Sequence, residues 1–211
     1  MNSVQIIEIN HGNDELAREV EASFANVRSN PPPGYSFFLT GENMDFRPRR
    51  VGDSYIVAVN HRGMIVGYTF VEEVSKASDI GEMSRLDWFD TINCPRNDAW
   101  GSLSKAELRS QPGYNSYSGS GSMLHLNCIE AFRKGRGIGR RIMQEIKMAG
   151  YELVELEAYG SNAERFFTKQ GFIDTGITTG DGAKRVMVWN NPLPLFSSVH
   201  YQEERSRIVH L

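Results

Sequence analysis

Cysteine, long apolar runs and excess charge are all scarce in this sequence. Only two of its 211 residues are cysteines, Cys94 and Cys128, and they form no Cys-x-x-Cys pair. Their scarcity speaks against a disulfide framework and favours free thiols in a reducing compartment. No window approaches the roughly 18 apolar residues of a membrane-spanning helix, and the opening residues MNSVQIIEIN lack the basic flank and apolar core of a secretory signal. We therefore expect a soluble, cytoplasmic protein with no membrane partner.

The charge is nearly balanced overall but not along the chain. Lysine and arginine total 23 against 26 acidic residues, a net charge of −3, which gives no general reason to expect nucleic acid as a partner. Residues 131–150 differ, because they hold a single acid, Glu145, and six basic residues: Arg133, Lys134, Arg136, Arg140, Arg141 and Lys147. We expect this segment to bind something anionic, and a nucleic-acid patch stays as the alternative.

Apolar periodicity predicts a mixed α/β domain. Alternating or β-rich runs predict strands, and apolar residues at helical spacing predict helices. The first helix, for example, would bury Leu16, Val20, Phe24 and Val27 on one face. The expected strands span residues 4–9, 54–59, 64–74, 123–129, 153–158, 172–178 and 184–189, and the expected helices span 14–27, 137–149 and 162–170. This order places antiparallel hairpins at both ends and a strand–helix–strand crossover in the middle.

Local signals indicate where several of these elements turn, begin or end. Gly63 closes the hairpin between the second and third strands, because glycine accepts a positive φ. Ser161-Asn-Ala-Glu164 has the spacing of a capping box, which predicts a helix from Asn162 that Gly171 ends.

Residues 75–121 interrupt the regular pattern, and we interpret them as an insertion between the third and fourth strands. They are polar, with a Gly/Ser/Tyr-rich end, and contain the run Asp87-Trp-Phe-Asp90. Two acids beside two aromatic rings could form a pocket for a cationic amine. The alternative is that Trp88 and Phe89 anchor the insertion to the core.

A glycine-rich turn, Lys134-Gly-Arg-Gly-Ile-Gly139, lies between a predicted strand and a predicted helix. Its glycines allow a tight turn that exposes N–H groups beside a helix N-terminus, an arrangement that binds phosphate. A Walker A loop is excluded because no Lys-Ser/Thr follows the glycines. The dinucleotide fingerprint is excluded because it requires glycine where Arg140 stands.

The turn resembles the acyl-CoA pyrophosphate loop of the GNAT superfamily of N-acetyltransferases. That loop is Arg/Gln-x-x-Gly-x-Gly/Ala, and Lys134, Gly137 and Gly139 stand at its defined positions. A second run, Ala163 to Phe172, is similar to the family's Ala-x-x-x-Tyr-x-x-x-Gly-Phe motif. The sequence departs from the pattern twice, with lysine at position 134 and with Phe167 at the tyrosine position.

This resemblance implies the fold and the activity. The fold would be a mostly antiparallel central sheet flanked by helices, in one domain over residues 1–194 with the insertion at 75–121, followed by a tail over 195–211. The activity would be transfer of an acetyl group from acetyl-CoA, without a metal, to an amine of a small molecule or a protein. A catalytically silent acyl-CoA-binding module and a nucleic-acid-associated acyltransferase stay as alternatives, and a homodimer stays open.

The resemblance also implies which residues bind the acyl donor. The strand before the turn, the turn itself and the second motif would contribute. These residues are Asn127, Cys128, Ile129, Lys134, Gly135, Arg136, Gly137, Ile138, Gly139, Arg140, Asn162 and Phe167.

Three further residues are candidates for proton transfer. His125 lies nine residues before Lys134, where some amine acetyltransferases of the family carry a catalytic histidine, and an imidazole is suited to proton transfer at neutral pH. Alternation places Leu124, Leu126 and Cys128 on the opposite face, so His125 and Asn127 should point together. Glu73 is the second candidate base, with Glu72 and Glu130 as neighbours that could serve instead. Tyr159, with Ser161 nearby, could supply the proton that Phe167 cannot.

Overall fold

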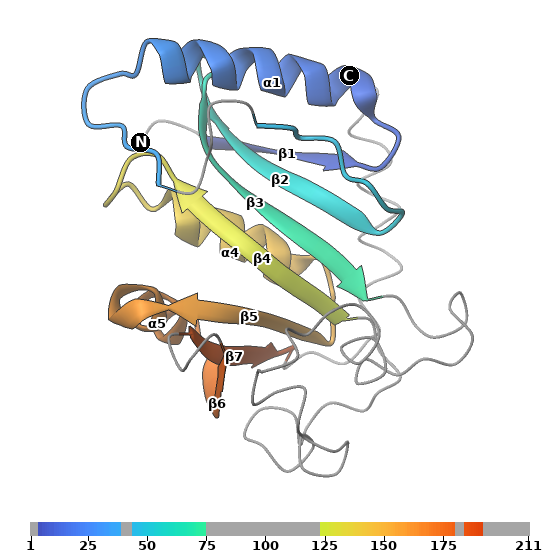
Figure 1. Ribbon diagram of the computed structural model, residues 1–211, viewed down its shortest axis with the longest axis vertical. Helices are drawn as coiled ribbons and strands as arrows, with labels where there is room; N and C mark the ends of the chain where they lie inside the picture. Colours follow the sequence, from blue (N-terminus) through green and yellow to red (C-terminus); the bar gives the residue numbers. More distant parts are fainter. Residues whose placement is uncertain (1–3, 39–43, 75–122, 180–183, 192–211) are drawn as a thin grey trace. The chain divides into compact units, whose positions relative to one another are not determined.

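The computed structural model describes residues 4–38, 44–74, 123–179 and 184–191 (Figure 1). The predicted insertion, with Asp87 to Asp90, and the predicted tail lie outside these residues. The elements are β1 (Val4–Asn10), α1 (Asp14–Ser29), β2 (Asp53–Asn60), β3 (Ile65–Val74), β4 (Met123–Ala131), α4 (Ile138–Met148), β5 (Leu153–Tyr159), α5 (Gly160–Lys169), β6 (Ile173–Thr179) and β7 (Lys184–Asn190).

The described strands form one mixed sheet in the order β1-β2-β3-β4-β5-β7-β6. The pairs β1–β2, β2–β3, β5–β7 and β7–β6 are antiparallel. Neighbouring strands β4 and β5 are joined through α4, the type of connection that parallel strands require. The expected fold class, a mostly antiparallel sheet with helices, is therefore confirmed. No helix in the described part of the chain is long and apolar enough to cross a membrane.

The chain divides into two compact units. The first contains β1, α1, β2, β3, most of β4 and the first part of α4. The second contains the start of β4, the end of α4, and β5, α5, β6 and β7.

In the first unit, α1 covers one face of β1, β2 and β3 (Figure 1). Val20, Phe24 and Val27 are buried as their helical spacing predicts, whereas Leu16 is only partly buried and Ala17 takes the innermost place. Acidic residues lie in the first turn of the helix and Arg28 lies in its last turn, which complements the helix dipole.

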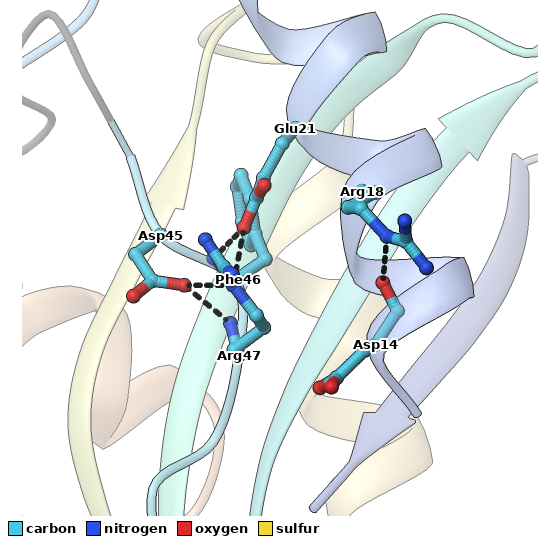
Figure 2. Close-up of polar contacts among 6 residues, drawn as sticks. All are labelled: Asp14, Arg18, Glu21, Asp45, Phe46 and Arg47. Atoms are coloured by element: carbon cyan, nitrogen blue, oxygen red, sulfur yellow. Dashed lines mark hydrogen bonds and ion pairs between the residues drawn. The ribbon is translucent and has the colours of Figure 1, made fainter. Parts of the chain in front are cut away.

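The irregular segment after α1 returns one aromatic ring to this core. Phe46 is fully buried, with its ring 5.8 Å from that of Phe24 and 5.6 Å from that of Tyr68. Figure 2 shows how polar contacts hold the segment on α1. The Glu21 carboxylate accepts the Phe46 N–H at 3.1 Å and lies 3.4 Å from Nε of Arg47. A segment without regular structure is thereby fixed beside the sheet.

The β2–β3 hairpin defines two faces of the first unit. Gly63 has φ of +69°, as its place in the turn predicts. In register, Asp53 lies opposite Glu72 and Val57 lies opposite Tyr68. Since Val57 and Tyr68 belong to the core under α1, this register places Asp53 and Glu72 on the α1 face. The other face meets α4, because a Cβ on Gly67 would lie 2.9 Å from Ile138.

In the second unit, β5 pairs with β7 along its whole length, and β6 lies at the edge. The predicted capping box at Ser161 is wrong. Helix α5 begins at Gly160 with Tyr159 as the N-cap residue, and no side chain caps it. The reason is Gly160 itself, whose φ of +77° turns the chain into the helix directly after β5.

Candidate functional site

The glycine-rich turn begins from a fixed residue in the first unit. Phe132 is fully buried, donates its N–H to the Val66 carbonyl at 2.9 Å and accepts the Ser36 N–H at 2.8 Å. The next residues, 133–137, are all exposed. Gly135 and Gly137 both have φ of +74°, and a Cβ on either would meet no atom within 4 Å. The turn is therefore anchored at its base and open along its length.

Helix α4 starts immediately after this turn. The first hydrogen bond into the helix is from the Arg141 N–H to the Gly137 carbonyl, at 2.9 Å. The N–H groups of Ile138, Gly139 and Arg140 precede that bond and have no partner one turn back. Together with the positive end of the helix dipole, these N–H groups form an anion-binding arrangement.

The charges around the turn have the same sign. Arg133, Lys134, Arg136, Arg140 and Arg141 are exposed, and the first turn of α4 contains no acid. The Glu145 carboxylate lies 3.1 Å from the Arg141 guanidinium and offsets part of this charge. Nζ of Lys134 lies 4.3 Å from the centre of the Phe38 ring. The structure thus brings together the predicted donor-binding residues 134–140.

Glu130, one of the candidate bases, holds neighbouring backbone in place. Its carboxylate is buried and accepts the Phe38 N–H in a short hydrogen bond. The Phe37 ring packs on Phe132 at 4.8 Å. These contacts hold residues 36–38 beside the start of the turn, so the role that they give Glu130 is structural.

His125 is paired in the second unit with a residue that the sequence reasoning missed. Its Nδ1 lies 3.1 Å from Oε1 of Glu155 on β5. The Glu155 side chain is fully buried and that of His125 is 12% exposed. The available signal was an acidic residue inside the strand predicted over 153–158. A fully buried carboxylate requires such a partner.

Asn127 and Cys128 both face β3 in the first unit. Asn127 donates from Nδ2 to the Glu72 carboxylate. The Cys128 thiol contacts Tyr68, and burial raises its pKa. Leu124 and Leu126 are buried and Asn127 is exposed, which is the pattern that alternation predicts for these residues.

Glu73 and Glu72 lie on opposite faces of β3. Glu73 donates its backbone N–H to the Gly52 carbonyl at 3.2 Å. Burial, and next the nearby Glu8 carboxylate, raise the pKa of Glu73. Asn127 donates its hydrogen bond to Glu72, so it contacts the carboxylate of the α1 face of β3 and Glu73 lies on the other face of that strand.

The second predicted motif forms helix α5 of the second unit. Tyr159 is 73% exposed, and Asn162 is exposed and accepts a hydrogen bond from Arg165 at 3.3 Å. Phe167, by contrast, is only 5% exposed, and its ring lies 5.5 Å from that of Phe172. Within this motif the structure places Tyr159 and Asn162 at the open start of α5 and Phe167 in the core.

No family model matches the sequence, and no curated protein matches it significantly. Solved structures do match. They include the polyamine N-acetyltransferase of Drosophila melanogaster, 15% identical over 89% of this chain and 100% of that chain, with a TM-score of 0.44. Arylalkylamine N-acetyltransferase 2 of Aedes aegypti is 12% identical over 90% and 99%, with a TM-score of 0.48. A bacterial toxin is 13% identical over 100% and 98%, with a TM-score of 0.43.

Proposed function

We propose that the chain is an N-acetyltransferase of the GNAT type, which transfers an acetyl group from acetyl-CoA to an amine. The observation that carries this proposal is the open, basic, glycine-bearing N-terminus of α4. The sequence excludes a Walker A loop and a dinucleotide-binding loop at this position. The N–H groups, the helix dipole and the side-chain charges all favour binding of a diphosphate.

Residues 134–140 would hold the pyrophosphate of acetyl-CoA. Gly135 and Gly137 leave open space where any other residue would project a Cβ, so a phosphate could approach the backbone closely. The bound donor would supply an activated acyl thioester. Lys134 adds a point charge in place of the family's planar arginine or amide.

His125 is the candidate that prepares the amine, because an amine attacks only when it is neutral. A neutral imidazole carries one N–H. If Nδ1 donates that hydrogen to Glu155 at 3.1 Å, Nε2 keeps the lone pair that accepts a proton. Glu155 then acts as a positioning residue. Glu73 stays a candidate base, and exposed Tyr159 a candidate proton donor to the departing thiolate.

The first test measures the binding of acetyl-CoA to the Gly139→Asp variant by titration calorimetry. An aspartate in the first turn of α4 suits the helix dipole, so the variant should fold. The negative charge of the aspartate should nevertheless repel the diphosphate. We expect the affinity for acetyl-CoA to fall by about 100-fold or more, because two negative charges would be brought together and partly desolvated without a counter-charge. Gly63→Asp, which adds the same charge at the open β2–β3 turn, is the control. Equal affinity in both variants would disprove the donor site.

The second test is turnover of His125→Ala with a panel of amines, measured as thiol release. Loss of a general base should lower kcat by about 100-fold or more and leave acetyl-CoA affinity unchanged. Glu155→Gln should also lower kcat, but by a smaller factor than His125→Ala. Imidazole ¹⁵N chemical shifts should then show a changed tautomer of His125. Near-normal turnover of His125→Ala would return His125 to a structural role.

The phenylalanine at position 167 is the observation that favours a second candidate function, a catalytically silent acyl-CoA-binding module. Phenylalanine has no proton to give to a departing thiolate. A thiolate is a fair leaving group near neutral pH, so an active enzyme should lose only about 10- to 100-fold from this absence. We expect Phe167→Tyr to raise turnover. Tight binding of acetyl-CoA with no transfer to any amine, by the wild-type chain and by Phe167→Tyr, would establish the silent module.

A further inference from the structure

Gly67, a buried residue of β3, lies against both β4 and α4 in the first unit. A Cβ on Gly67 would lie 2.6 Å from the Glu130 carbonyl oxygen and 3.2 Å from Cα of Ala131, at the end of β4. The same Cβ would lie 2.9 Å from Cγ2 of Ile138, the first residue of α4. These neighbours flank residues 132–137 in the chain. One glycine therefore contacts the two ends of the segment that contains the open turn.

Neither of the two nearest neighbours can move away by a side-chain rotation. Non-bonded carbon atoms lie about 3.5–4.0 Å apart at optimal separation, so a side chain at Gly67 would require a shift. The Glu130 carbonyl oxygen belongs to the backbone and moves only with β4. Cγ2 of Ile138 branches directly from Cβ, and the χ1 angle of isoleucine in a helix is restricted. A side chain at position 67 would therefore displace the end of β4, the start of α4, or both.

The pairing of β2 with β3 is irregular at the same place. Ala58 lies opposite Gly67, whereas the next residue, Val59, lies opposite Ile65, so β3 has one extra residue, Val66. A bulge bends its strand locally, and a glycine inside a strand is typical of a close approach by another backbone. Ala58 is fully buried and adds only a methyl group beside Gly67. The sheet is therefore shaped to let β4 and α4 approach β3 closely.

We propose that Gly67 is a positioning residue for the anion-binding start of α4. Because it has no side chain, Glu130 and Ile138 both pack on β3, and this packing fixes where the helix begins relative to β4. The N–H groups of residues 138–140 then point to one place, where they bind a diphosphate together. The inference rests on the proposed function for the identity of the ligand, acetyl-CoA, and on the packing of β3, β4 and α4 for the role of Gly67.

The first measurement is titration calorimetry of acetyl-CoA with the full chain and with its Gly67→Ala variant. We expect the affinity to fall by about 10-fold or more, because hydrogen bonds to a charged phosphate weaken when their donors are displaced. Val71→Ala is the control, since Val71 is buried on the same face of β3 and its truncation leaves a cavity further along the strand. It should lower the midpoint of urea unfolding and leave the affinity unchanged. A similar loss of affinity in both variants would overturn the positioning role.

Ile138→Ala tests the same contact without a steric clash, because alanine removes Cγ2 and favours the helix. In this background, Gly67→Ala should weaken acetyl-CoA binding by a smaller factor than in the wild-type chain. An equal factor would overturn the proposal. Should Gly67→Ala not fold, Ile138→Ala alone should weaken binding and speed hydrogen exchange of the Arg141 N–H, which makes the first bond of α4. Val71→Ala should do neither, and unchanged binding and exchange in Ile138→Ala would also overturn the proposal.

Two further readouts separate the role of Gly67 from folding and from the proposed function. In an active chain, Gly67→Ala should raise KM for acetyl-CoA and leave kcat unchanged. A partly unfolded population would instead lower the apparent kcat, because fewer molecules are active, and that result would contradict the positioning role. A wild-type chain that transfers no acetyl group, yet binds inorganic pyrophosphate more tightly than Gly67→Ala does, would support the role of Gly67 and contradict the enzyme.

Discussion

Two helix ends carry the motifs of this sequence, and glycine shapes both in opposite ways. At the start of α4, Gly137 has φ of +74° and nothing within 4 Å of the place of a Cβ. At the end of α5, Gly171 has φ of +84°, and a Cβ would lie 3.8 Å from Trp189 and 3.9 Å from Nζ of Lys147. The same backbone conformation therefore faces open space in one unit and packed side chains in the other.

The end of α5 satisfies its own polar groups. The Gly171 N–H donates to the Thr168 carbonyl at 2.9 Å, and the Phe172 N–H donates to the Phe167 carbonyl at 3.1 Å. This is a Schellman motif, in which Phe172 also packs against Phe167. Lys147 donates to the Gln170 carbonyl. A closed helix end stabilises the fold, whereas the exposed N–H groups of α4 are available to a ligand.

Of the changes that test this contrast, removal of the buried Phe172 ring should have the largest effect on stability. Phe172→Ala leaves a cavity beside Phe167, and we expect the free energy of unfolding to fall by about 3–5 kcal/mol. Phe38→Ala is the matched control at the open end. It removes an exposed ring over Lys134 and should cost about 1 kcal/mol or less. Urea denaturation measures both, and similar losses would contradict the contrast.

Removal of one basic side chain at each helix end should separate effects on stability from effects on acetyl-CoA binding. Lys147→Ala removes a bond to a helix carbonyl and a cation 4.9 Å from the Trp189 ring, which should lower the free energy of unfolding by about 1–2 kcal/mol. Arg136→Ala removes an exposed charge from the turn and should leave stability within about 0.5 kcal/mol. It should instead weaken acetyl-CoA binding and reduce the salt dependence of that binding. The reverse pattern would mean that the ends had been assigned the wrong roles.

Addition of one methyl group to each glycine is the finest comparison. Gly137→Ala and Gly171→Ala both force a side chain into positive φ, so both should lose about 1 kcal/mol of stability. Only Gly137→Ala should also weaken acetyl-CoA binding, because its methyl group enters the space that a phosphate would occupy. Thermal unfolding with and without acetyl-CoA measures both quantities. An equal ligand-induced rise in Tm for the two variants would refute the difference.

Local patterns predicted most of the described elements. The spacing of Val20, Phe24 and Val27 predicted the buried face of α1, and Gly63 and Gly171 predicted a turn and a helix end. These predictions succeed because each depends on residues close in sequence. The capping box at Ser161 failed for a local reason too, since Gly160 could turn the chain earlier than any side-chain cap.

The tertiary structure decided what the strands bring together. Only strand pairing places Glu155, fully buried, 3.1 Å from His125. The contact of Cys128 with Tyr68 likewise depends on β3 and β4 being neighbours in the sheet, which no spacing in the sequence indicates.

By itself the sequence determined the open turn between Lys134 and Gly139, because glycine conformation and helix polarity are properties of the local chain. The register of β2 on β3 placed Asp53 opposite Glu72. Asp53 and Glu72 are far apart in sequence and become neighbours only when backbone hydrogen bonds set one strand against the other.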